Sequence, residues 1–489
     1  MAQNPMWYQS KLSRRTMLQL TAGVTSASFL SACVGGVAPQ AGSNSGASSA
    51  AVDMTSVVPR AAGGGMSGEV VVGIQGGPEA DAHIRNVPRF AEMTGNTLTV
   101  RVEDVGRDVW SSRWLTNFQS QSDEWDAVNI QNGPFKLAGP AGFLLPLNDY
   151  MDNPELFNKE RFNLADWPQA LLDLFTIDGK LYEFPQEAST LMFYYRTDLL
   201  EKYGIEPPGP QGYSWDELIA NSRIAQKGIA DDGLEDTYPL LFGTKRTHAS
   251  IHFQQIAWSY GADLFVDGKM PNFNTPEAIA ALEDEVGWVL QDKLVTPGMV
   301  GYEYPEVLTA YQQGKAVFAL QWNAAAPDIL NPEKSPESAG KTAFSVFPWQ
   351  VDKGPEALRL WPSVWSMGVS AFSKRPEEAF EYITWFTSKD VARDYVMNGG
   401  GSSGRQSLLT DPEILASNPQ FAAMGEGFKV YHAMPDLVSY DFINTDILPA
   451  HLQAVWQGEK SAKEGLDDAT EEAKQYLSIR ARFKGVNLW

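Results

Sequence analysis

Residues 178–208 read DGKLYEFPQEASTLMFYYRTDLLEKYGIEPP, a stretch in which a turn signal and strand patterns follow one another. Asp178-Gly179 is the type of two-residue turn that joins hairpin strands, so residues 175–184 are predicted to form a β-hairpin. Tyr194 and Tyr195 are adjacent in a strand pattern. Because side chains alternate between the faces of a strand, one tyrosine is expected in the core while the other faces outward.

The segments on either side alternate between strands and helices. Apolar runs at 69–74, 98–102 and 126–130 are predicted strands, and apolar residues spaced three apart between 78 and 95 indicate a helix. Further elements are predicted downstream: helices beginning at Ser214, Thr275 and Ser461, a short helix at 305–313 and a strand at 316–320. This alternation predicts α/β units on mostly parallel sheets.

The composition is that of a large, acidic globular chain. Its 489 residues are 43% hydrophobic, and the length suggests two or three compact units. The formal charge of −22 repels phosphate backbones, so no nucleic-acid partner is expected and the ligand is predicted to be neutral or cationic. The single Cys excludes an internal disulfide and a multi-Cys metal cluster, and neither a metal nor a cofactor is expected.

The N-terminus has the pattern of an export signal. Arg14 and Arg15 precede a mildly apolar run, 17–30, that is too short and too polar for a stable membrane span. Paired arginines at this place are typical of twin-arginine signals, although Sec signals also carry arginines. Export across the bacterial cytoplasmic membrane is therefore predicted, with the route left open.

The lone cysteine follows this run. LSAC at 30–33 resembles the lipobox of bacterial lipoproteins, so residues 1–32 are predicted to be a signal peptide and Cys33 the lipid-modified first residue of the mature chain. Residues 33–68 are rich in Gly, Ser and Ala and are predicted to form a flexible tether. The protein is expected on the outer face of the cytoplasmic membrane, in the periplasm or on the cell surface.

Five motifs occur in a specific order along the rest of the chain. They are AGFLLPLNDYM (141–151), the stretch 178–208, SWDEL (214–218), YQQGKAVFALQWN (311–323) and SMGVSAFSKRPEEAFEYITWFTSKDVARDY (366–395). Together they resemble the extracellular solute-binding proteins of ABC importers, in the sugar-binding family that includes the maltose-binding type. The resemblance runs from about Glu69 to the C-terminus. Arg196 and the missing glycine at 321–323 depart from the family pattern near the expected cleft.

The resemblance implies an α/β fold of the two-lobed periplasmic-binding-protein type (type II), with a mixed sheet flanked by helices in each lobe and a hinged cleft between the lobes. The first lobe would comprise 69–183 plus 361–410, and the second 186–348 plus 415–489. Ligand would favour closure by contacting both lobes. The implied function is capture of a carbohydrate, an oligosaccharide by preference, by a monomeric lipoprotein that delivers it to the transmembrane subunits of an ABC permease. No enzymatic activity is expected.

The same resemblance places ligand contacts at eight positions: Glu79, Gln131, Asn132, Tyr194, Trp322, Trp361, Trp365 and Arg405. Tryptophan rings suit the C–H face of a pyranose, and amides both donate to and accept from hydroxyl groups. Several of these positions have a second interpretation. Glu79 could be a solvated loop carboxylate, the two amides could serve turn chemistry, Tyr195 could replace Tyr194 at the cleft, and Arg405 could clamp a lobe.

Other sequence patterns are weaker evidence for a function. Residues 400–404, GGSSG, satisfy the nucleophile-elbow motif but follow a helical pattern, which indicates a glycine run at a helix end. His248 and His252 lack the glutamate of a zinc-protease helix and are interpreted as surface or cleft histidines. Glu183 and Glu187 alone do not argue for a glycosidase. A surface-tethered glycoside hydrolase, a sensor module, and a binding protein for a glycerol phosphoester or peptide remain the alternatives.

Overall fold

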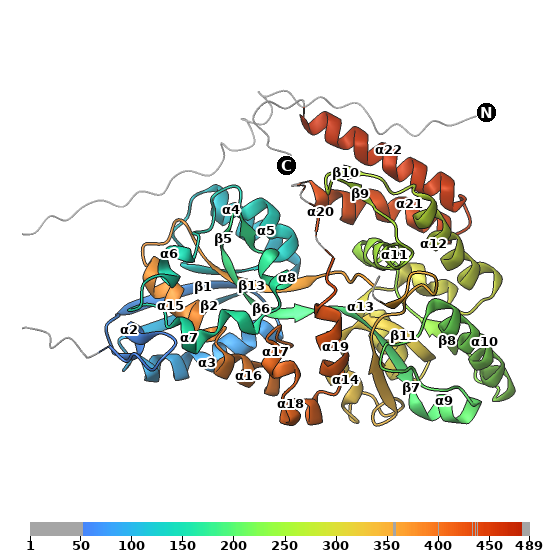
Figure 1. Cartoon of the computed structure of the whole chain (residues 1–489), viewed down its shortest axis with the longest axis horizontal. Coiled ribbons are helices and arrows are strands. Elements are labelled where there is room, and N and C mark those ends of the chain that lie inside the picture. The colour runs from blue at the N-terminus through green and yellow to red at the C-terminus, as the bar shows by residue number, and fades with distance from the viewer. Residues whose placement is uncertain are drawn as a thin grey trace, which may run out of the picture. The chain divides into compact units, whose positions relative to one another are not determined.

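The computed structural model describes residues 52–355, 358–399, 401–432, 434–435, 437 and 439–481 (Figure 1). The predicted signal peptide and lipidation site, with Arg14, Arg15 and Cys33, lie outside the described residues. Within the described part, no helix combines the length and the apolar character needed to cross a membrane.

The first of two main sheets has five strands in the order β2-β1-β3-β13-β6. They are β1 (Gly68–Gln75), β2 (Leu98–Val105), β3 (Ala127–Gln131), β6 (Glu183–Ser189) and β13 (Ser363–Val369). β1 pairs in parallel with β2 and β3, whereas β13 is antiparallel to β3 and β6. The three strands predicted between 69 and 130 are confirmed, and the sheet is mixed because β13 returns from far along the chain.

Helices and short helical turns accompany this sheet. They are α3 (Pro78–Met93), α4 (Arg107–Gln119), α5 (Asn132–Ala138), α6 (Asn148–Met151), α7 (Lys159–Phe162), η1 (Leu164–Asp166), α8 (Gln169–Asp173), α15 (Pro376–Phe386), α16 (Lys389–Met397), α17 (Gln406–Leu409) and α18 (Pro412–Ser417). In α3, Phe90 is fully buried but Ile84 is exposed, so the predicted helix is confirmed with a narrower apolar face.

The predicted hairpin forms between β4 (Thr176–Ile177) and β5 (Lys180–Leu181). Asp178 has φ 50° and Gly179 φ 73°, so both central residues adopt the left-handed conformation that a type I′ turn requires. The predicted hairpin and its two-residue Asp-Gly turn are therefore confirmed.

The second sheet has four strands in the order β12-β7-β11-β8. They are β7 (Leu191–Arg196), β8 (Tyr238–Leu241), β11 (Ala316–Trp322) and β12 (Thr342–Ser345), and a small separate hairpin joins β9 (Phe265–Val266) and β10 (Met270–Pro271). The strand predicted at 316–320 is β11. It runs parallel to β8 and antiparallel to β7.

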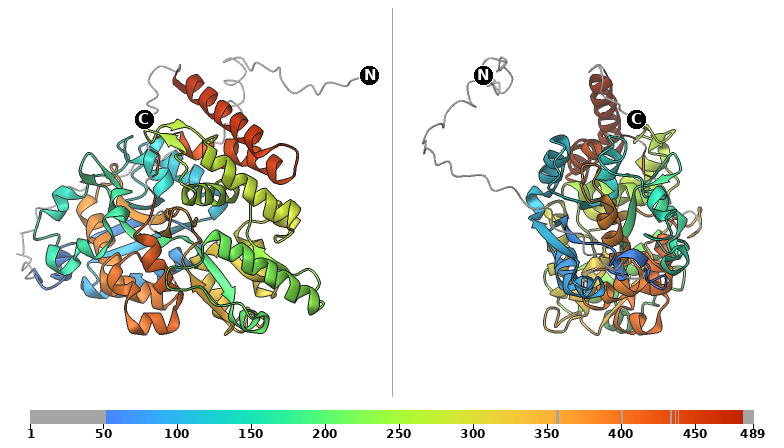
Figure 2. Two further views of the ribbon diagram at one scale, coloured as in Figure 1. Left: turned by 45° about the vertical axis from the view of Figure 1, so that its right-hand side comes forward. Right: turned by 90° about the vertical axis from the view of Figure 1, so that its left-hand side faces the viewer.

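The remaining helices include all of those whose N-terminal signals were recognised. They are α9 (Thr197–Tyr203), α10 (Trp215–Asp231), α11 (Thr247–Ser259), α12 (Pro276–Val286), η2 (Gly287–Gln291), η3 (Pro297–Gly301), α13 (Tyr304–Gln312), η4 (Asn323–Ala325), α14 (Ala326–Leu330), α19 (Gln420–Phe428), α20 (Tyr440–Phe442), η6 (Ile443–Ile447), α21 (Leu448–Trp456) and α22 (Ala462–Ala481). Ser214 caps α10 through the predicted capping box, and the long α22 packs beside α21 (Figure 2).

The chain passes from the first sheet to the second within two residues. β6 ends at Ser189 and β7 begins at Leu191, so one strand leads directly into the other (Figure 1). The return takes place between β12, which ends at Ser345, and β13, which begins at Ser363. We call residues 187–191 the crossing segment. It lies where the two sheets are joined.

The end of the predicted tether is folded. Residues 59–62 form the short helix α2, and Val58, Ala61 and Met66 are almost fully buried. Arg60 forms an ion pair with Glu377 on α15. The prediction that all residues up to 68 form a flexible tether is therefore wrong for this part, because its scattered apolar side chains pack against the body of the protein.

Candidate functional site

The crossing segment brings particular strand ends of the two sheets together. β3 and β6 lie on either side of β13 and antiparallel to it, so they run the same way and their carboxyl ends share one edge of the first sheet. In the second sheet, Trp322 at the end of β11 pairs with Leu191 at the start of β7. Open α/β sheets bind ligands at such edges. The crossing is therefore where the fold itself places a candidate site.

Trp322 is held at this edge by contacts to each of its polar groups. Its backbone N–H donates to Gln321 Oε1 at 2.9 Å, and its carbonyl accepts from the Tyr194 hydroxyl at 2.6 Å. Its indole Nε1–H donates to His248 Nε2 at 3.1 Å. The ring is only partly buried. With every donor and acceptor engaged by the protein, what Trp322 offers a ligand is the face of its ring.

Trp365 lies across the crossing, on the first sheet. It is opposite Gln131 on β3 and opposite Glu187 on β6. Trp365 and Gln131 are partly exposed, whereas Glu187 is 4% exposed. Gln131 Nε2 donates to Ser363 Oγ at 2.9 Å. Glu187 and Leu191 are four residues apart, so the strand positions opposite Trp365 and Trp322 are separated by about 13 Å of strand. Trp365 and Trp322 thus lie opposite the two ends of the crossing segment.

A buried polar network fixes the crossing itself, and the sequence analysis missed it. Asn323 Oδ1 accepts from the Thr190 backbone N–H and from the Ser189 hydroxyl, both at 2.7 Å, and Asn323 Nδ2 donates to Ser402 Oγ at 3.1 Å. Tyr431 donates its hydroxyl to the Ser189 carbonyl at 2.8 Å. The departure from the family pattern at 321–323 thus has a structural explanation: Gln321 binds backbone, and Asn323 binds backbone and neighbouring serines.

Two predicted contacts turn out to be structural. Asn132 is 3% exposed, and its amide binds the backbone before and within β13: Oδ1 accepts from Val364 N–H at 2.9 Å, and Nδ2 donates to the Pro362 carbonyl at 3.2 Å. Tyr194 is fully buried, and its ring packs edge-on against Tyr311 and Phe344. Neither side chain faces a ligand, and Tyr194 acts instead through its hydrogen bond to the Trp322 carbonyl.

The alternative tyrosine does not replace Tyr194 at the site. Tyr195 is 9% exposed and its ring stacks on Phe193 at 5.9 Å. Arg196, expected near the cleft, lies at the opposite end of β7 from Leu191, where it forms a two-point ion pair with Asp198 at 2.7 and 2.8 Å. Strand alternation predicted that one tyrosine is buried. It could not predict that both faces of β7 are covered.

Trp361 is also a core residue. It is 7% exposed and stacks between Trp258 on α11, at 6.0 Å, and Tyr440 on α20, at 5.9 Å. Its backbone N–H donates to Gln255 Oε1 at 3.0 Å. Of the pair Trp361 and Trp365, only the second keeps a partly open ring, because the first is enclosed by the helices that precede and follow it in the chain.

Arg405 is fully buried and clamps elements of one lobe. Its guanidinium donates to the carbonyls of Thr387 and Phe162 at 2.9 and 3.1 Å, pairs with Asp166 at 3.3 Å, and lies 3.7 Å above the ring of Trp167. Burial lowers the pKa of Arg405 to about 10, against the opposing effect of Asp166. The clamp interpretation fits this geometry, and the ligand-contact interpretation does not.

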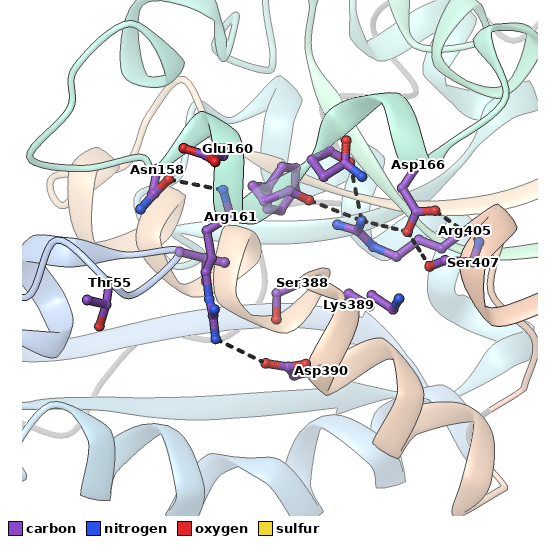
Figure 3. A pocket seen from close by; sticks show the side chains of 13 residues that line it. Thr55, Asn158, Glu160, Arg161, Asp166, Ser388, Lys389, Asp390, Arg405 and Ser407 are labelled. Atoms are coloured by element: carbon purple, nitrogen blue, oxygen red, sulfur yellow. Dashed lines mark hydrogen bonds and ion pairs between the residues drawn. The ribbon is translucent and has the colours of Figure 1, made fainter. Parts of the chain in front are cut away.

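A polar cavity of about 570 Å³ adjoins this clamp rather than the crossing (Figure 3). In Figure 3, Arg405 points toward Asp166, and Arg161 points toward Asp390, from which it is separated by 4.0 Å. Ser388 and Lys389 at the start of α16 line the same cavity. Two pairs of its charged side chains, Arg405 with Asp166 and Arg161 with Asp390, are engaged with each other.

Glu79 lies in the first turn of α3, directly after β1, and is partly exposed. This is the position that the resemblance implies, so its role as a ligand contact stays a prediction. Gln131, Trp322 and Trp365 likewise remain candidates, and they are the three predicted residues that the structure brings to the crossing with partly exposed side chains.

The sequence patterns that resembled catalytic or metal-binding motifs have structural explanations. Ser402 is 2% exposed and donates its hydroxyl to the Ala188 carbonyl, so this serine helps to hold the crossing. Glu183 is fully buried, and burial raises its pKa well above the usual range, which removes it from any substrate. His252 is 2% exposed and stacks on Phe242, whereas His248 reaches Trp322. The described residues contain no group of three His, Cys, Asp or Glu placed to hold a metal ion.

A fold of two α/β sheets joined by crossing strands, with aromatic residues at the crossing, defines the class of two-lobed binding proteins. A profile of the bacterial extracellular solute-binding proteins matches residues 76–393, and the chain belongs to this family. The family is extracellular by description, which agrees with the predicted export.

Similar proteins come from several bacteria. A probable amino-acid ABC transporter periplasmic-binding protein of Sinorhizobium fredii is 25% identical over 277 residues, which are 54% of this chain and 57% of that protein. Maltose-bound MalE3 of T. maritima has a TM-score of 0.70 and 21% identity, covering 83% of this chain and 99% of that one. A ribitol complex of an ABC transporter solute-binding protein from Agrobacterium radiobacter K84 has a TM-score of 0.70 and 21% identity, covering 83% of this chain and 98% of that one. The predicted two-lobed fold is confirmed.

Proposed function

We propose that this protein is the substrate-binding component of an ABC importer for a neutral carbohydrate or polyol, and that it captures the ligand at the crossing between its two sheets. The observation that carries the proposal is the environment of Trp322. Its backbone and indole groups are all engaged by the protein, while its ring stays partly exposed at the sheet edge. Such a ring suits the C–H face of a sugar.

Two further residues support a ligand with hydroxyl groups. Trp365 supplies a second partly open ring, opposite the other end of the crossing segment, and two stacking rings suit a ligand with more than one sugar unit, such as an oligosaccharide. Gln131, opposite Trp365 on β3, provides an amide group of the kind that binds hydroxyls. The eight-residue set predicted from the resemblance reduces in this proposal to Glu79, Gln131, Trp322 and Trp365.

The charges near the crossing favour a neutral ligand. Arg405 is used inside one lobe, Arg196 lies at the far end of β7, and Arg246, next to His248, pairs with Glu303 at 3.7 Å. The chain as a whole carries −22. An amino acid, which the Sinorhizobium relative's description suggests, or a glycerol phosphoester would bring a carboxylate or phosphate that needs a cation to pair with. A sugar or a polyol brings none.

The proposal includes location and delivery. The chain would be anchored by a lipid on Cys33, with residues from 34 to the low fifties as its tether, and it would act as a monomer that passes ligand to the transmembrane subunits of a permease. The lobe boundaries proposed from the resemblance are 69–183 with 361–410 and 186–348 with 415–489; because β6 continues the first sheet to Ser189, the first lobe would extend a few residues past 183. Metabolic labelling with a radioactive fatty acid tests the anchor, with Cys33→Ser as the matched control.

A ligand screen tests the binding function. Thermal unfolding of the purified chain would be followed with maltose, ribitol, D-mannitol, L-glutamate and glycerol 3-phosphate. A solute that binds the folded state raises the transition temperature, and 100-fold excess over Kd adds about 2.7 kcal/mol. The proposal predicts stabilisation by at least one neutral compound. Stabilisation by the anionic compounds alone contradicts it, and release of glucose from maltose supports a glycoside hydrolase.

A further inference from the structure

His248 lies in the first turn of α11, the helix that follows β8 at the same edge of the second sheet as Trp322. Its Nε2 is 3.1 Å from the indole nitrogen of Trp322, and the two rings are nearly perpendicular, at 86° with centroids 6.4 Å apart. The imidazole therefore meets the edge of the indole and leaves the faces of the indole clear of this contact.

The chemistry of this hydrogen bond fixes the state of the histidine. An indole N–H is only a donor, so the imidazole nitrogen that it meets must be the acceptor. His248 must then be neutral, with its proton on Nδ1. A protonated imidazole presents N–H at both nitrogens, and two N–H groups would oppose each other across the same 3.1 Å.

We propose that His248 is a positioning residue for ligand binding: in its neutral form it holds the Trp322 ring in the orientation that receives the ligand, and its protonation releases the ring and weakens binding. The binding part rests on the proposed function, since it requires Trp322 to touch ligand. The positioning part rests on the contact alone. Apart from this contact, only packing restrains rotation of the Trp322 indole about its side-chain bonds. The hydrogen bonds made by the Trp322 backbone hold the main chain and not the ring.

The surroundings of His248 place its titration on the acid side of neutrality. Burial lowers its pKa, while the carboxylates of Glu303 and Glu306 on the α13 side oppose that effect. Arg246, next to it on the chain, is 3.7 Å from Glu303, and Lys245 acts on Glu306. His252, one turn along α11, has a pKa of about 3 and stays neutral throughout this range. His248 is therefore neutral at pH 7.5 and gains its proton below pH 6.5.

The contact is tested without ligand by NMR of the full chain labelled with ¹⁵N-tryptophan. The Trp322 indole resonance is assigned by its loss in Trp322→Phe. We expect this resonance to shift between pH 7.5 and pH 4.5 with a single midpoint below 6.5 in the wild type. His248→Gln, whose amide oxygen reaches the position of Nε2, should hold the indole without titrating. His248→Asn, whose amide is one carbon shorter, should lose the contact.

The consequence for binding is tested by calorimetric titration with maltose and with D-mannitol over the same pH range. We expect roughly 3- to 10-fold weaker binding by the wild type at pH 4.5 than at pH 7.5, the range that loss of one hydrogen bond produces. His248→Gln should bind with little pH dependence, and His248→Asn should bind weakly at both pH values. Unfolding temperatures of both variants at pH 7.5 control for loss of fold.

The outcomes distinguish the positioning role of His248 from its effect on ligand binding. An indole resonance that ignores pH, or that titrates equally in His248→Gln, overturns the positioning role. A titrating resonance with equal affinity at both pH values overturns the coupling to binding. If neither maltose nor D-mannitol binds the wild type, the proposed ligand class fails for these probes, the coupling is rejected with it, and the resonance still decides the contact.

Discussion

Glu381→Gln is expected to make the protein more stable, and increasingly so as the pH rises. Glu381 lies on α15 with no exposed surface, beneath the N-terminal segment that contains Arg60 and Ala61. Burial raises its pKa to about 9, against the opposing effects of the Ala61 backbone N–H and of Arg60. The carboxyl is therefore protonated in the folded protein at pH 7 and ionised in the unfolded chain.

The sign and size of this stability change follow from proton linkage. Between the unfolded pKa near 4.5 and the folded pKa of about 9, the folded state binds one proton more than the unfolded state. The free energy of unfolding therefore falls with rising pH, by about 1.4 kcal/mol per unit from this residue, or about 3 kcal/mol between pH 5 and pH 7. Glutamine keeps the shape and cannot ionise, so it removes this loss.

Urea unfolding at pH 5, 6 and 7 measures the effect. The difference in unfolding free energy between Glu381→Gln and the wild type should grow with pH, up to about 3 kcal/mol in favour of the variant at pH 7. Glu283→Gln, which removes an exposed carboxylate from α12, should show no such trend. A difference that is constant with pH, or a variant that becomes relatively less stable as pH rises, refutes the reasoning, because it means that Glu381 is ionised in the folded protein.

Four further substitutions separate binding from structure. Trp322→Ala should weaken carbohydrate binding about tenfold with little change in melting temperature, as measured by calorimetric titration. Trp361→Ala should instead cost about 3–5 kcal/mol of stability in urea unfolding, because it removes a ring from a buried stack. Equal destabilisation by the two substitutions would place Trp322 in the core. Arg405→Lys should cost about 3–5 kcal/mol by urea unfolding, since a lysine cannot serve the same carbonyls and Asp166, and a neutral result would mean that the clamp is dispensable. Asn323→Ala should cost about 1–3 kcal/mol and speed amide exchange at residues 189–190 by mass spectrometry; unchanged exchange would show that Asn323 does not hold the crossing.

The sequence predicted local structure well where a short-range signal exists. Asp178-Gly179 specified its turn, Ser214 and Glu217 specified the start of α10, and the apolar runs marked the strands of the first sheet. These features depend on neighbouring residues alone. The scattered apolar residues at 58–66 gave no periodic signal, and their burial depends on contact with α15, which is about 320 residues away in the chain.

The site was harder to predict because each side chain's role depends on distant partners. Trp361 and Trp365 look alike in the sequence, yet α11 and α20 bury only the first. The sequence singled out His248 and the segment 321–323 without giving their roles, since their partners, Trp322 and Thr190, reach them only through strand pairing and the crossing. A motif resemblance located the region of the site. It could not distinguish a side chain that faces ligand from one that supports it.

Binding of a neutral carbohydrate or polyol at the crossing can be measured by calorimetric titration of the full chain with maltose, ribitol and D-mannitol. The titrations are carried out on the wild type, on Trp322→Ala and on Trp365→Ala. We expect one-to-one binding of at least one of these compounds by the wild type, weakened in both variants, with the compound recovered unchanged. Absence of heat with all three while L-glutamate binds, or wild-type affinity in both variants, would contradict it.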